Sequence, residues 1–238
     1  MDDIAELRAE AASVPVHGVW TRGGPVFSNL SDDTVRGLEA RSIATFGDSA
    51  TVGVWAFATG AWMTGLFQAG LLPVRDLTNL FPVLLVYAGL VLFVSGLFLF
   101  RRNNTFLASS FCSFGAFNLT RGVVLLCENR GLFPAGGVTD ILQGVMFEAF
   151  AWIALSLLIG AVRMNVVLVL VWLCAFAGFA LSGLWFINNS PAQGIWSQLG
   201  CVGGYFVLAA GTFAFYAGSA FLINTAWQRN VLPIGGKA

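Results

Sequence analysis

Charge is scarce in this chain of 238 residues, whose twelve basic and twelve acidic side chains cancel to a net charge of zero. Charged residues make up 10% of the chain, against about 25% in a soluble domain. So few Lys and Arg leave no electrostatic footprint for nucleic acid. A soluble globule of this size could not bury the 57% of residues that are hydrophobic. The composition therefore predicts a chain whose solvent is lipid.

Chemically reactive residues are equally few. The one histidine, His17, lies near the N-terminus, which excludes His-based triads in the apolar part and most zinc sites. The four cysteines are scattered and form no C-x-x-C pair, so they predict no disulfide scaffold. The glycine spacing of a phosphate-binding P-loop is absent. We therefore expect no enzyme, no catalytic residue, no metal and no cofactor.

Long apolar runs dominate what is present. A helix needs roughly 20 apolar residues to cross the hydrocarbon core, whereas a barrel strand needs about 10 that alternate strictly. The chain is therefore predicted to be an all-α integral membrane protein, a bundle of six transmembrane helices with short connections. The predicted spans are residues 50–72, 80–100, 105–127, 139–162, 165–187 and 196–224.

The basic residues predict the orientation of these spans. Nine Lys and Arg fall on the side that holds both termini, and two, Arg75 and Arg130, fall on the other side. By the positive-inside rule both termini are predicted to be cytoplasmic, in a plasma, inner or organelle membrane. Residues 1–46 form a charged cytoplasmic arm with short helices predicted over 2–12 and 31–43, residues 47–228 form the membrane domain, and 229–238 form a tail.

Glycines recur at seven-residue spacing within four of the spans, a step that returns to nearly the same helix face. Because apolar burial does not drive helices together in lipid, small residues that let backbones approach are important for packing. The spacing predicts a tightly packed bundle. The glycines are Gly53, Gly60, Gly89, Gly96, Gly115, Gly122, Gly204, Gly211 and Gly218.

Two charges are predicted at membrane depth, Arg121 in the third span and Glu148 in the fourth. A lone charge there costs about 2.5–3.5 kcal/mol on insertion scales. Their depths nearly match in antiparallel neighbours, which predicts an ion pair, either a structural clamp or a charged element lining a solute or proton path. Tyr87, Asn118 and Tyr216 are among the weaker polar groups, which bond across helices or face a narrow aqueous path.

Four stretches together resemble the acetate uptake transporter family, also called succinate–acetate permeases. Residues 104–117 read N-T-F-x4-F-x-S-F-G-x-F, and residues 231–235 read V-L-P-I-G. Tyr87-Ala88-Gly89 with Gly96 resembles the family's second helix, and Gly203-Gly204-Tyr205 with Gly211 and Tyr216 resembles its sixth. The resemblance covers about residues 47–236.

The resemblance implies a six-helix protomer in a homohexameric ring, each protomer with its own pathway. It implies movement of acetate and similar small monocarboxylates, by proton coupling or channel-like conduction. The expected partners are thus the lipid bilayer, a small carboxylate and a proton, with other membrane subunits possible and no nucleic acid.

The chain departs from the family at its solute site. The family opens its first helix with N-P-A-P-L-G-L, and the matching run here is D-S-A-T-V-G-V over 48–54. The resemblance makes a vestibule of Asp48, Ser49, Ala50, Thr51 and Gly53.

The family's central constriction, an aromatic residue, a Tyr and a Leu, aligns with Phe57, Phe114 and Ala175, which predicts a wider and drier gate. Arg121 and Glu148 stand where the family is apolar or has Gly.

Two function classes follow. The first is a membrane transporter or channel for acetate or a similar small monocarboxylate, proton-linked. The alternative is a transporter-derived structural or accessory subunit of a larger membrane complex. It is suggested by the loss of polar family residues, such as the Asn replaced at position 48 and the Tyr replaced by Phe114. Altered solutes such as ammonia or an alcohol, and sensing, remain as further readings.

Overall fold

The structure is a computed structural model that describes residues 48–133, 138–188 and 195–235. Its contacts divide the chain into two units, Met1–Gly47 and Asp48–Ala238, and the fold described below is that of the second. The predicted arm over 1–46, with its two short helices, lies outside the described residues. The side chains of residues 74, 75, 138, 139 and 195–197 are likewise not described.

The predicted six-span bundle is confirmed in the described residues, where six helices are long and apolar enough to cross a membrane. The first is α3 (Ala50–Gln68). The second is a continuous rod of η1 (Val74–Leu80), α4 (Phe81–Leu85), the π-helix η2 (Val86–Val91) and α5 (Leu92–Arg101). The others are α6 (Thr105–Asn129), α7 (Val138–Ala161), α8 (Val166–Asn188) and α9 (Ile195–Trp227).

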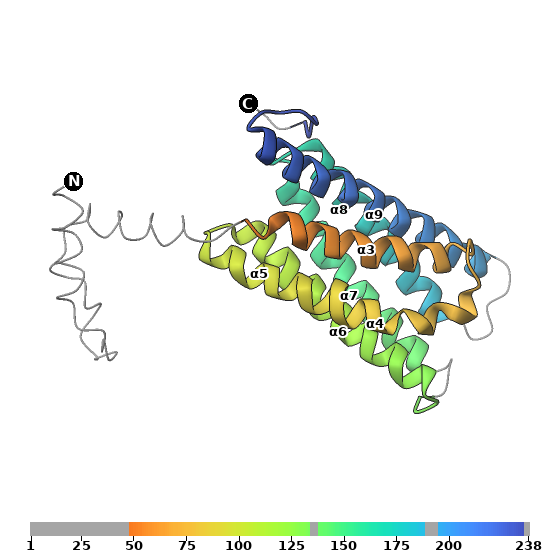
Figure 1. Ribbon diagram of the computed structural model, residues 1–238. Helices are drawn as coiled ribbons and strands as arrows, with labels where there is room; N and C mark the ends of the chain where they lie inside the picture. The colour runs from red at the N-terminus through yellow and green to blue at the C-terminus, as the bar shows by residue number, and fades with distance from the viewer. Residues whose placement is uncertain (1–47, 134–137, 189–194, 236–238) are drawn as a thin grey trace, which may run out of the picture. The chain divides into compact units, whose positions relative to one another are not determined.

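The helices run along one common direction (Figure 1), and their contacts join the spans into a closed ring in chain order. α3 packs along the second span, the second span along α6, α7 along α8 and α8 along α9. Extensive contact between α9 and α3 closes the ring, whereas α6 and α7 touch only briefly. Neighbours are antiparallel because the connections are short, and residues from α3, α6, α7, α8 and α9 line the interior of the ring.

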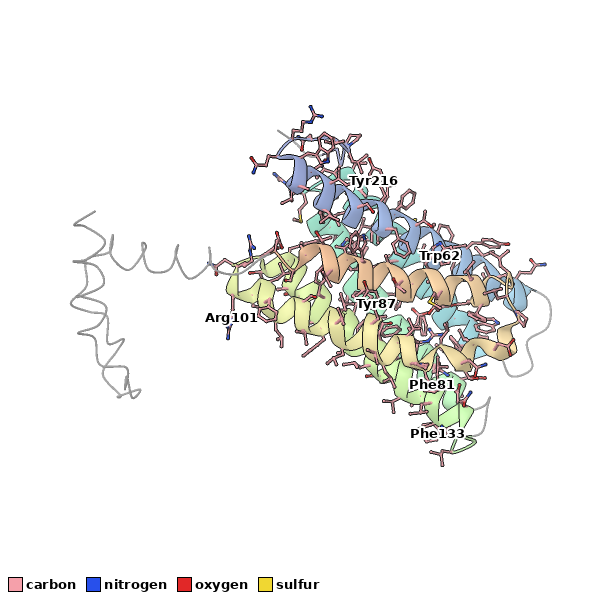
Figure 2. All side chains as sticks on the ribbon, in the orientation of Figure 1. Trp62, Phe81, Tyr87, Arg101, Phe133 and Tyr216 are labelled. Atoms are coloured by element: carbon pink, nitrogen blue, oxygen red, sulfur yellow. The ribbon has the colours of Figure 1, made fainter. Side chains whose placement is uncertain are left out.

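We name the two ends of the ring by what they hold. The tail face is the end where α3, α6 and α8 begin, where α5, α7 and α9 end, and where the C-terminal segment 228–235 lies. The opposite face is the other end. Figure 2 shows Arg101 at the tail face, where α5 ends, and Phe133 beyond the end of α6 at the opposite face.

The first span is four residues shorter than predicted. α3 stops at Gln68 because Gly70 takes a φ of +75°, a left-handed conformation that suits glycine and breaks the helical repeat. The amides of Leu71 and Leu72 fold back to the Leu66 carbonyl at 3.0 and 3.1 Å, which satisfies the carbonyl that the helix end leaves free.

The π-helix η2 interrupts the second span beside α6. A π-turn shifts the backbone register by one residue and is often found at functional sites. Here the buried amide of Asn118 on α6 donates from Nδ2 to the carbonyl oxygen of Ala88 at 3.0 Å. This bond ties the irregular turn to the inward face of α6.

The seven-residue glycine pattern marks helix contacts, as the sequence predicts. A Cβ atom at position 115 would lie 2.7 Å from the backbone nitrogen of Phe93, and one at position 211 would lie 2.6 Å from that of Trp62. Position 96 meets Cys112 in the same way, at 2.7 Å from Sγ. Since these are distances that a side chain cannot adopt, the glycines set how closely the helices approach.

The V-L-P-I-G segment closes the tail face by hydrogen bonds. Asn224 on α9 accepts from the amides of Val231 and Leu232 at 2.8 and 2.9 Å and donates to the Leu232 carbonyl at 2.9 Å. The segment's last carbonyls, from residues 234 and 235, then accept from the amides of residues 167 and 166. The tail thereby caps the first turn of α8, whose amides have no partner within the helix.

We expect Gly115→Val to lower the midpoint of thermal unfolding of the detergent-purified protein, by an amount equivalent to about 1–3 kcal/mol or more, because its side chain overlaps the Phe93 backbone. Ala116→Val is the matched control, since Ala116 is the next residue and is exposed. Equal midpoints for the two variants would contradict close packing at this contact.

Candidate functional site

Three aromatic rings meet on the axis of the helix ring, one from each of three helices. The centroids of Phe57 on α3 and Phe114 on α6 are 5.7 Å apart, and Trp172 on α8 lies 5.6 Å from the first and 5.2 Å from the second. All three side chains are buried. We call this set the aromatic layer.

A small cavity lies on each side of the aromatic layer, with Phe57 in the wall of both. The first, of about 30 Å³, has Gly60, Thr64, Asn118 and Arg121 in its wall and lies toward the opposite face. The second, of about 20 Å³, is walled by Val54, Leu107, Ser110, Phe111, Leu168, Val171, Trp172, Ala214 and Ala217 and lies toward the tail face. The layer thus separates two chambers on one axis.

The two chambers differ in polarity. Along α3 the inward stripe runs from Phe57 through Thr64 to Gln68, and along α6 it runs from Phe114 through Asn118 to Arg121. Both stripes therefore become polar past the layer, toward the opposite face. The tail-face chamber has mainly aliphatic and aromatic walls, with Ser110 bonded to the Phe106 carbonyl of its own helix at 2.7 Å.

A polar contact between Gln68 and Ser182 lies past the first chamber, toward the opposite face. The Gln68 amide donates from Nε2 to the Ser182 hydroxyl, which itself donates to the Gly178 carbonyl at 2.5 Å. Both side chains are buried, and Oε1 of Gln68 has no hydrogen-bond partner. A polar stripe therefore continues from the first chamber toward the opposite face.

Arg121 is the largest fully buried side chain among the described residues, with 1% of its surface exposed. Its guanidinium carbon lies 4.7 Å from the Phe147 ring centre and 5.9 Å from that of Phe186, and Glu128 is the acidic group whose charge acts on it. Its Nε and Nη2 atoms have no hydrogen-bond partner. A desolvated cation–π contact contributes about 2 kcal/mol, but each buried donor left unpaired costs about 1–3 kcal/mol.

The predicted Arg121–Glu148 ion pair is not present. Glu148 turns toward α8, where its carboxylate reaches the Leu184 backbone and lies against Gly183, and its Oε1 atom has no hydrogen-bond partner. The pairing prediction was wrong because matched depth does not fix rotation about the helix axis. On α7 it is Phe147, the residue before Glu148, whose ring lies under the guanidinium.

The structure brings together some of the predicted site residues. Phe57, Phe114, Asn118 and Arg121 line the first cavity. Ala175 is buried but lines neither cavity, and Trp172, three residues earlier, is the α8 side chain that contacts both phenylalanine rings. The indole of Trp172, and not Ala175, therefore completes the layer of rings.

The other predicted polar residues lie away from both chambers. Tyr216 is partly exposed and donates its hydroxyl to the Pro233 carbonyl at 2.7 Å, so it holds the tail. Tyr87 is half-buried beside the core. Neither they nor Glu148 line the cavities.

The five vestibule residues form the start of α3 at the tail face and line neither cavity. Asp48 accepts a hydrogen bond from the Ala50 amide at 2.9 Å, which forms an Asx turn just before the helix. Ser49 donates to the Ser95 carbonyl at 2.9 Å, and Gly53 faces the Phe111 ring. Ala50 is buried and Thr51 half-buried. A vestibule role for this turn remains a prediction.

Sequence reasoning missed Trp172, Thr64 and Gln68. The signal available for the last two was their spacing from Phe57 on one face of the first span, at seven and eleven residues. No such signal marked Trp172, because aromatic residues are common throughout the spans and its rotation is set by packing.

Residues 33–233 match the GPR1/FUN34/yaaH family over most of the chain. The chain belongs to that family. It is 30% identical over 149 residues to the succinate-acetate/proton symporter SatP of Escherichia coli K12, covering 63% of this chain and 75% of that protein, with the same figures for SatP of Shigella flexneri. The predicted family is confirmed. The prediction of a multi-pass integral membrane protein is confirmed with it.

A solved structure has the same fold. The structure of the bacterial acetate channel SatP matches 80% of this chain and 99% of its own, with a TM-score of 0.71 and 24% sequence identity. Similarity at that level establishes the six-helix fold of this member of the GPR1/FUN34/yaaH family.

Arg121 and Glu148 are expected to act independently. In acetate-free buffer, Arg121→Met should raise the midpoint of thermal unfolding because it removes a buried charge with unpaired donors. A cycle of Arg121→Met, Glu148→Gln and the double variant should give a coupling energy below about 0.5 kcal/mol. A coupling above about 1 kcal/mol would contradict the separation of these two groups.

Proposed function

We propose that this protein moves acetate or a similar small monocarboxylate across a membrane, through the axis of each protomer, as a transporter or channel rather than an enzyme. The observation that carries the proposal is the pair of chambers on one axis, separated only by the rings of Phe57, Phe114 and Trp172. Membership of a family that includes proteins named for acetate transport and conduction supports the solute class.

We further propose that the tail face is cytoplasmic. Arg101, Arg102, Arg163 and Arg229 lie at or next to helix ends on that face, and Arg130 lies at the opposite face. Positive charge is enriched on the cytoplasmic side of membrane proteins. The polar chamber, with Arg121, would then open toward the outside, so a solute arriving from outside meets it before the aromatic layer.

The aromatic layer favours passage of the protonated acid. An anion between three rings would lose its hydration and could gain one hydrogen-bond donor at most, the indole Nε1 of Trp172, which has no partner in this structure. The neutral acid carries no net charge to desolvate. Each acid molecule that crosses carries its own proton, and uptake is therefore proton-linked. We expect the protomers to assemble as a homohexamer, as the family resemblance implies, with the pathway inside each protomer.

The alternative is an accessory subunit of a larger membrane complex. It is favoured by one observation, the contact among all three rings, which leaves the layer closed in this structure. A transporter with a gate is also closed in one of its states, so flux rather than structure separates the two functions.

The test is uptake of labelled acetate into proteoliposomes at several values of external pH, with uptake into protein-free vesicles subtracted. The acid form of a carboxylic acid with a pKa of about 4–5 falls about tenfold for each pH unit above it. Protein-dependent uptake at a fixed total acetate concentration should therefore fall steeply as the pH rises from about 5 to 7.5.

Two outcomes would contradict this account. Protein-dependent flux that does not change over that pH range would exclude the neutral acid as the species that crosses. No protein-dependent flux at any pH, from a folded protein, would favour the accessory-subunit function.

A further inference from the structure

The first chamber contains a cation with unpaired hydrogen-bond donors. Arg121 lines the cavity and has only 1% of its surface exposed. Its Nε and Nη2 atoms have no hydrogen-bond partner. A guanidinium is permanently charged and presents its donors in a planar fork. Unpaired donors on a buried charge are rare in proteins and call for a missing partner.

The chain itself does not supply that partner in the described residues. Glu148 is turned toward Gly183 on α8. Glu128 acts on Arg121 through its charge, but it lies seven residues further along α6, about 10 Å at 1.5 Å per residue. Its Oε1 atom accepts a hydrogen bond from Gln143 at 3.0 Å. Phe147 and Phe186 contact the guanidinium but have no acceptor atoms to offer its N–H groups.

The wall of the cavity beside Arg121 combines polar and apolar groups that suit a small carboxylate. Its volume of about 30 Å³ holds about two water molecules, so a two-carbon acid, which has four heavy atoms, requires side chains in the wall to move apart. Thr64 and Asn118 add hydrogen-bonding groups on the same wall, and Phe57, Phe114 and Val207 provide an apolar surface for a methyl group. A carboxylate pairs with a guanidinium through two parallel hydrogen bonds.

We propose that Arg121 is the carboxylate-binding residue of a solute site in this chamber, on the opposite-face side of the aromatic layer. The choice of a carboxylate rests on the proposed function, whereas the need for an anion rests on the unpaired guanidinium. The site holds acetate as the anion. Crossing of the layer as the neutral acid is a separate, later step, so Arg121 sets affinity and the layer sets pH dependence.

The direct test is binding, which needs no transport. Sodium acetate should raise the midpoint of thermal unfolding of the detergent-purified protein by about 2–4 °C or more when it saturates the site. Sodium chloride at equal ionic strength and acetamide, a neutral molecule of nearly the same shape, should not. The shift should be absent in Arg121→Gln, reduced in Arg121→Lys, which keeps the charge but loses the fork, and intact in Arg163→Gln, whose arginine is exposed at the tail face.

The outcomes separate this site from the proposed function. An equal acetate shift in wild type and Arg121→Gln, or an equal shift with chloride, would overturn the carboxylate assignment even if flux is observed. An acetate shift that depends on Arg121, in a protein without flux, would support the site and remove the transport function.

In flux measurements Arg121→Gln should raise the acetate KM about tenfold or more, as the loss of a charged hydrogen-bond pair does, with the slope of flux against pH unchanged. A purely structural role would lower the maximal rate and leave KM as it was. That result would overturn the proposal.

Discussion

The ring of Phe114 is the contact around which the interior of this protein is organised. It lies 5.2–5.7 Å from the rings of Phe57, Phe150, Trp172 and Phe179 and 6.3 Å from that of Phe117, so it joins α3, α6, α7 and α8 at one level. With 1% of its surface exposed, it is almost completely enclosed by its neighbours. The two chambers exist as separate spaces because this cluster closes the axis between them.

The glycine contacts make that closure possible. Helices that approach through glycine, as α6 does at Gly115 and α9 at Gly211, bring opposing walls near enough for rings from different helices to touch. The brief contact between α6 and α7 is bridged largely by side chains, among them Phe117 and Arg121 against Phe147. A buried charge is thus accommodated where the helix backbones are least tightly joined.

Hydropathy and spacing were enough for the architecture, because lipid fixes the length of a span and close approach requires small residues. Family resemblance placed Phe57 and Phe114 on the axis. What could not be predicted depends on rotation about each helix. Matched depth suggested that Arg121 and Glu148 pair, but Phe147 takes the inward position on α7. For the same reason Ala175 was predicted at the constriction, whereas Trp172, one turn away, makes the ring contacts.

The most direct test of the central claim, that the aromatic layer is the barrier between the chambers, is acetate flux in proteoliposomes through Phe114→Ala compared with Phe150→Ala. Both variants remove a ring from the cluster, but Phe150 lines neither cavity. The account predicts that Phe114→Ala, confirmed as folded by thermal unfolding, conducts faster and with a weaker dependence on pH, while Phe150→Ala conducts as wild type does. Equal flux and equal pH dependence in the two folded variants would contradict it.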